Sequence, residues 1–289
     1  GGVYGWGFTV VVPQTGELAH RNLSYWGYRG FGNAILATGD LRYADAWSRM
    51  VDQINEQAKV IDGVTMYPRM YGDAGWYAFE PTPYSYGALD LYYWTQSERD
   101  LARVRHDPWV RFLLGENPAY PVEAMQADFE TIRRKVAQGV YGETLTPDTR
   151  LSDNPNPYNP ATVASLVRLM LGGLPTGNAG FPLQARLRYF DPAARRPGLP
   201  PDVAALVEQM SADETVVYLV NLNQTEARSV VVQGGGYGEH RLREALIGDR
   251  STPVDGAWCM VRLDAGCGGR LRLLMDRYAN PPTMHFPWA

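Results

Sequence analysis

Residues 213–236 read DETVVYLVNLNQTEARSVVVQGGG, and this stretch decides the fold class. It contains two runs rich in β-branched residues, 215–222 and 227–233, and the second run ends at three consecutive glycines. Two further strand-like runs follow at 258–263 and 270–275, and the turn residues Asp264, Ala265 and Gly266 lie between them. We therefore predict at least four short strands over residues 213–289, which form either an antiparallel sheet or a small antiparallel β-sandwich.

The chain before residue 213 shows helical spacing instead. Apolar residues recur every three or four positions after Asp40, after Pro121 and after Asn159. Two segments, 24–37 and 84–95, are apolar all round, which is typical of inner helices. A last short helix is predicted to carry Val203, Leu206, Val207 and Met210. Helices followed by strands predict an α+β protein with a helical domain at 1–212 and a β domain at 213–289.

Composition excludes several classes of protein. The chain has 289 residues, of which 45% are hydrophobic and 20% charged, with a net charge of −4, so disorder is excluded. No apolar run is long enough to span a membrane, and no basic surplus favours nucleic acid. Two Cys and four His make a zinc site improbable, and we expect no metal and no cofactor. Cys259 and Cys267 are either incidental thiols or a disulfide across a hairpin.

Residues 67–94 read YPRMYGDAGWYAFEPTPYSYGALDLYYW and are dense in Tyr and Trp. Such side chains suit sugars, because they offer a flat apolar face and a polar edge. Asp73, Glu80 and Asp90 lie within this stretch. Glycoside hydrolysis needs two carboxylates, one acting as an acid and one as a base or nucleophile. We predict that these three residues supply the pair. Alternatively, Asp73 closes a turn, Glu80 is solvated and Asp90 pairs within the helices.

Further residues are predicted to contact the ligand because they are aromatic or polar and lie near these acids or in Pro-rich loops. Arg29 lies among aromatic residues and needs a partner, either a structural one or an anionic or hydroxylated ligand. The predicted binding residues are Trp26, Arg29, Trp76, Tyr77, Tyr84, Tyr86, Asp153 and Asn154.

The segments TGDLRYADAW (38–47) and GDAGWY (72–77), the aromatic inner helices and the β-rich end together resemble the (α/α) toroid enzymes of glycan metabolism. The resemblance implies a barrel of helical hairpins followed by a β-sandwich, a carbohydrate substrate, and a glycoside hydrolase or polysaccharide lyase activity. It also implies an exported protein, since glycan-processing proteins of this build are often exported.

A complete toroid needs about twelve helices of 10–14 residues each, which is more than this chain supplies. We therefore expect either that an N-terminal portion is missing, so that the toroid is partial, or that the array closes as a homo-oligomer.

Our leading functional prediction is a glycoside hydrolase. If the protein is instead a lyase, Tyr77 or Tyr84 removes a proton while Arg29, Arg69 or Asn154 neutralises a uronate. The sequence is also compatible with a non-catalytic carbohydrate-binding or structural module, and with an isomerase or dehydratase that acts on an apolar alcohol.

Overall fold

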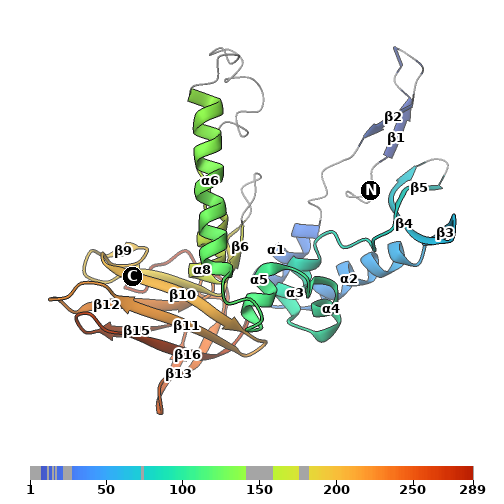
Figure 1. Cartoon of the computed structure of the whole chain (residues 1–289). Helices are drawn as coiled ribbons and strands as arrows, with labels where there is room; N and C mark the ends of the chain where they lie inside the picture. Colours follow the sequence, from blue (N-terminus) through green and yellow to red (C-terminus); the bar gives the residue numbers. More distant parts are fainter. Residues whose placement is uncertain are drawn as a thin grey trace. The chain divides into compact units, whose positions relative to one another are not determined.

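The computed structural model describes residues 8–11, 13–14, 16, 18–21, 28–72, 75–140, 159–175 and 182–288. The chain divides into two compact units (Figure 1). The first comprises Gly1–Arg105 and Arg277–Pro282, and the second comprises His106–Asp276 and Thr283–Ala289. This division differs from the predicted boundary at 212/213, because strands before residue 213 share sheets with strands after it.

Helices and one small sheet build the first unit. Its helices pack in sequence, α1 on α2, α2 on α3 and α3 on α4, around the buried side chains of Trp47, Val51 and Leu91. The sheet has the order β3-β4-β5, and β1 and β2 form a separate hairpin. The elements are β1 (Phe8–Val11), β2 (Leu18–Arg21), α1 (Tyr28–Thr38), α2 (Arg42–Asn55), β3 (Lys59–Ile61), β4 (Val64–Gly72), β5 (Gly75–Glu80), α3 (Ala88–Thr95) and α4 (Glu98–Val104).

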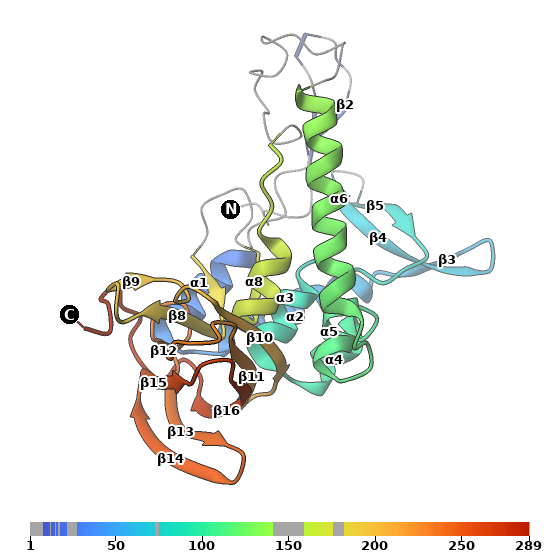
Figure 2. The same cartoon turned by 60° about the vertical axis from the view of Figure 1, so that its left-hand side comes forward.

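The second unit combines helices with two larger antiparallel sheets. The strand orders are β10-β11-β16-β13-β14 and β15-β12-β8-β9, and β6 pairs with β7. The long helix α6 rises away from the sheets, and α8 lies beside its lower part (Figure 2). The elements are α5 (Pro108–Leu113), α6 (Tyr120–Val140), α8 (Ala164–Leu171), β6 (Gly173–Leu174), β7 (Gln184–Ala185), β8 (Leu187–Asp191), β9 (Arg196–Pro197), β10 (Val203–Met210), β11 (Glu214–Asn221), β12 (Arg228–Gly234), β13 (Arg241–Ile247), β14 (Arg250–Gly256), β15 (Trp258–Leu263) and β16 (Gly268–Asp276).

The four predicted strands are confirmed as β11, β12, β15 and β16. In β16 the side chains alternate, with Leu271, Leu273 and Met275 buried and Arg270 and Arg272 exposed. Arg272 forms an ion pair with Glu214 of the adjacent strand β11, and Arg270 forms one with Glu208 of β10, two strands away. This alternation of apolar and charged residues is typical of a strand that has one buried and one exposed face.

The predicted helix at 203–210 is wrong, because this segment is strand β10, which pairs with β11. The register shifts between Val207 and Gln209, so a bulge inserts one residue into the strand. Val203 and Val207 share the buried face before the bulge, and Met210 is buried after it. The buried residues Val203, Val207 and Met210 are therefore four and three positions apart, because the bulge interrupts the two-residue alternation of the strand. These spacings resemble those of a helix.

The predicted toroid is also wrong. Within the described residues there are seven helices, and helix and strand make up 31% and 34% of the structure. Along the chain, strands β3, β4 and β5 come between α2 and α3, and several antiparallel sheets are present, so the protein has a mixed α+β fold. The TGDLRYADAW motif spans the end of α1 and the start of α2, where the Asp40 carboxylate accepts a hydrogen bond from the backbone N–H of Arg42. That motif marks a helix start, and it does not specify a ring of helices.

Candidate functional site

The site lies in the first unit, where the β4–β5 hairpin meets the start of α3. A pocket of about 480 Å³ opens there. Arg69 of β4 and Glu80 at the end of β5 form one part of its wall, and Asp90 in the first turn of α3 forms another. Residues 82–89 complete the lining. Two of the three predicted carboxylates therefore share one pocket.

Arg69 fixes the position of Glu80. Its Nε donates to Glu80 Oε2 at 2.8 Å. Its Nη2 donates to the backbone carbonyl oxygen of Thr82 at 2.6 Å and to Thr82 Oγ1 at 2.8 Å. The Arg69 side chain is only 19% exposed, whereas that of Glu80 is 59% exposed. With a further bond from its Nη1 to the Pro68 carbonyl oxygen at 3.4 Å, the guanidinium is held by four hydrogen bonds, and the carboxylate that it contacts stays accessible to a ligand.

Aromatic rings pack behind the pocket. Tyr86 lines it and meets the Tyr28 ring edge-on, with ring centroids 5.5 Å apart. Tyr28 in turn stacks on Trp47, also at 5.5 Å. Burial, and next the negative charge of Asp90, raise the pKa of the Tyr28 phenol to about 12. Tyr28 therefore stays neutral over the whole physiological range and contributes no competing charge near Asp90.

The loop between β5 and α3 is fastened to α2. The Asn55 side chain donates to the carbonyl oxygen of Tyr84 at 3.0 Å and accepts from the N–H of Tyr84 at 2.7 Å. Gly87 adopts a φ of +70°, and a Cβ there would come within 2.9 Å of Trp47 Nε1. A glycine is needed at this position for both its conformation and its close contact. These contacts hold the pocket wall in one arrangement.

The predicted site residues are only partly brought together. Glu80, Asp90, Tyr84 and Tyr86 line the pocket. Arg29 lies on α1, where its Nε donates to the Tyr28 hydroxyl at 3.3 Å. Trp76 and Tyr77 lie on β5, where the Trp76 ring contacts Tyr71 with centroids 4.9 Å apart, and neither residue is among those that line the pocket. Trp26, Asp73, Asp153 and Asn154 lie outside the described residues.

Sequence reasoning missed the role of Thr82 and the function of Asn55. Thr82 accepts two hydrogen bonds from Arg69, and Asn55 anchors the loop from another helix. These interactions join residues that are 13 and 29 positions apart, respectively. No local spacing rule connects residues at such separations, so only the fold reveals them.

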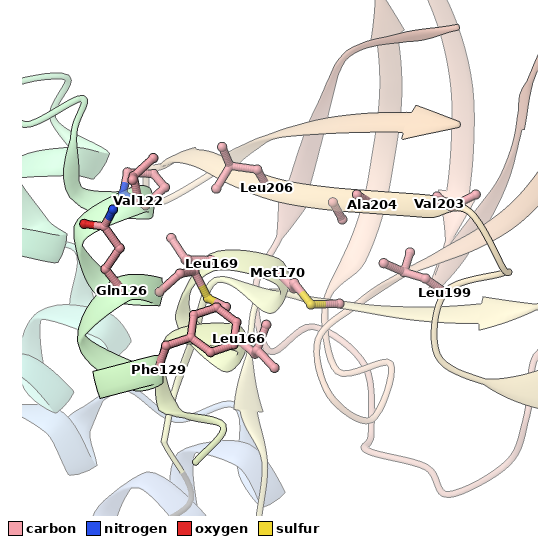
Figure 3. Close-up of a pocket in the computed structure, with 13 residues that line it drawn as sticks. Val122, Gln126, Phe129, Leu166, Leu169, Met170, Leu199, Val203, Ala204 and Leu206 are labelled. Carbon is pink, nitrogen blue, oxygen red and sulfur yellow. The ribbon is translucent and has the colours of Figure 1, made fainter. Parts of the chain in front are cut away.

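A second cavity, of about 540 Å³, lies in the second unit between α6, α8 and β10 (Figure 3). Its thirteen lining residues are apolar except for Gln126. A cavity without an acid or base among its lining side chains cannot perform acid–base chemistry. The pocket that holds Glu80 and Asp90 is therefore the better candidate for a catalytic site.

The described part of the chain shows neither a metal site nor a membrane span. Within the described ranges, no three His, Cys, Asp or Glu side chains are grouped so that they could hold a metal ion. Cys259 and Cys267 are both free thiols. None of the described helices is long and apolar enough to span a bilayer. Comparison with protein-family models, curated proteins and solved structures yields no match for this chain.

Proposed function

We propose that the pocket between the β4–β5 hairpin and α3 binds a saccharide and that the protein hydrolyses glycosidic bonds. One observation carries the proposal: Glu80 and Asp90 line the same pocket, next to Tyr86. A tyrosine offers both an apolar face for the C–H side of a sugar ring and a hydroxyl for its edge. A cavity of about 480 Å³ has the size of a ligand site.

The two carboxyl groups would divide the chemistry of hydrolysis between them. One donates a proton to the glycosidic oxygen as the bond to the anomeric carbon breaks. The other either takes a proton from the attacking water, whose oxygen bonds to that carbon, or attacks the carbon itself before water completes the reaction. Glu80 suits the second role, because its ion pair with Arg69 fixes the position of its carboxyl group while 59% of the side chain stays exposed.

Conservative variants test this assignment. Glu80→Gln and Asp90→Asn keep the shape of each side chain but remove its charge and its proton transfer. Each variant should lower kcat/KM, measured on a polysaccharide that the wild-type protein hydrolyses, by about a hundredfold or more. Glu56→Gln is the matched control, since Glu56 is an exposed glutamate at the end of α2 and does not line the pocket. A loss of less than tenfold in both site variants would refute the role of the pair.

A lyase is the second candidate, because Arg69 and Tyr84 line the same pocket. A guanidinium can neutralise a uronate carboxylate, and a tyrosine can take the adjacent proton. The products distinguish the two reactions. A lyase releases an unsaturated product that absorbs ultraviolet light, whereas a hydrolase releases reducing ends without that chromophore. Binding of the saccharide with neither product would indicate a non-catalytic binding module.

We also propose that the two larger sheets of the second unit form a β-sandwich. Strands β13 and β14 of one sheet contact β15 of the other. Leu242 and Leu273 are buried in the first sheet, and Val230 and Val261 are buried in the second. Two sheets that each bury one apolar face can form one core between them.

A further inference from the structure

Helix α6 carries an apolar stripe with the spacing of a coiled coil. Its 21 residues make it roughly 30 Å long at 1.5 Å per residue. Along it, apolar side chains recur at alternating steps of three and four, which places them at positions a and d of successive heptads. The members of the stripe are Val122, Met125, Phe129, Ile132 and Val136.

Among the described residues, the elements that contact α6 cover the stripe only in part, since Met125, Ile132 and Val136 are half-buried. Helices α5 and α8 contact it. Nevertheless, the Val122 side chain is 62% exposed and that of Phe129 is 52% exposed. In Figure 3, Phe129 lies beside Leu166 and Leu169 of α8, and together they border the open apolar cavity of about 540 Å³. A soluble monomer rarely exposes a continuous apolar surface of this kind without a partner.

We propose that this surface, formed by the α6 stripe and the adjoining groove of α8, is the interface with a second copy of the same chain. Two copies related by a two-fold axis would bury the stripe, because the α6 helix of each copy presents the same apolar side chains to the other. The charges that flank the stripe agree with self-association. With Val122 and Phe129 at position a, Asp128 occupies position g and Arg133 occupies position e.

Both orientations of the helix pair bring opposite charges together. In a parallel pair, Asp128 faces Arg133 of the partner subunit, and in an antiparallel pair it faces Lys135 of the partner subunit. No like charges are forced into contact in either arrangement. An apolar ligand would use the cavity but would not require this charge pattern, so the second copy is the occupant that the observations favour.

Sedimentation equilibrium of the 289-residue chain tests the proposal. Over a micromolar concentration series, the wild type should sediment with twice the mass of one chain. Phe129→Asp should weaken dimerisation by at least about tenfold, because it places a charge at the centre of the interface. Ala127→Asp is the matched control: it adds the same charge to the same helix at an exposed position outside the stripe, and should leave the dimer intact. Asp128→Arg should also weaken the dimer, since it brings cations together in either orientation.

Circular dichroism verifies that each variant keeps its helices. If Phe129→Asp fails to fold, Val122→Asp replaces it, because Val122 is even more exposed. A wild-type chain that stays monomeric over the whole series would overturn the proposal. So would equal dissociation constants for Phe129→Asp and Ala127→Asp. These results do not depend on glycan hydrolysis, which the site in the first unit tests separately.

Discussion

Individual charged residues show how strongly the surroundings set a side chain's role. Arg69 and Glu80 lie eleven residues apart, yet a two-stranded hairpin and a loop place them 2.8 Å from each other. Glu239 illustrates the opposite situation, because it is 2% exposed. Its carboxylate accepts hydrogen bonds from the N–H groups of Gly236 and Tyr237. Those bonds and the charge of Arg188 favour the ionised form, but burial outweighs them and raises the pKa of Glu239 to about 7.

This shift predicts a pH-dependent stability. Between pH 4.5 and pH 7 the folded chain binds more protons at Glu239 than the unfolded chain does, so the free energy of unfolding falls as the pH rises. The contribution is on the order of 3 kcal/mol and is fully lost above pH 7. Glu239→Gln should flatten this dependence in urea unfolding curves measured across the interval.

Glu226→Gln serves as the control for that experiment. Glu226 lies in the same unit, its side chain is 65% exposed, and it pairs with Arg228. Its removal should leave the slope with pH unchanged. If Glu239→Gln unfolds with the same slope as the wild type, the ionisation of Glu239 does not control the stability.

At the scale of elements, the success of a prediction depended on whether the pattern was regular. Helix α6 was predicted from Met125, Phe129 and Ile132, and strand β16 from a strand-like run bounded by turn residues, because neither element contains an irregularity. The predicted helix after Asp40 is confirmed as α2, but it ends at Asn55, and residues 59–61 form strand β3. Ala58 and Ile61 lie beyond α2 but continue the spacing of its apolar residues, so spacing alone predicts a longer helix and cannot locate its end.

Helix α1 provides a test of how closely its neighbours pack. A Cβ added at Gly32 would lie 2.3 Å from Trp94 Cζ2, whereas one added at Gly30 would meet nothing within 4 Å. Gly32→Ala should therefore destabilise the protein by about 1–3 kcal/mol through overpacking. Gly30→Ala should instead be neutral or stabilise by up to about 1 kcal/mol, since alanine favours the helix. Thermal unfolding measures both, and equal effects would contradict the close packing of Trp94 on α1.

At the scale of the whole molecule, the sequence predicted the fold class but not the architecture. The α+β class followed from the sequence itself, in which apolar residues have helical spacing before residue 213 and form strand-like runs after it. The arrangement of elements depended on long-range pairing, such as that of β8 with β12, which no local pattern reveals. Likewise, the sequence indicated Glu80 and Asp90 as chemically suitable, but only the hairpin and the start of α3 bring them to one pocket.

The most direct test of the central claim is a double-mutant cycle on that pocket. It compares kcat/KM of the wild type, Glu80→Gln, Asp90→Asn and the double variant on one polysaccharide that the wild type hydrolyses. Two groups that act on the same bond as a unit give strongly non-additive losses, so the double variant should be little worse than the poorer single variant. Losses that simply multiply, or a double variant as active as the wild type, would contradict the proposal that Glu80 and Asp90 act together.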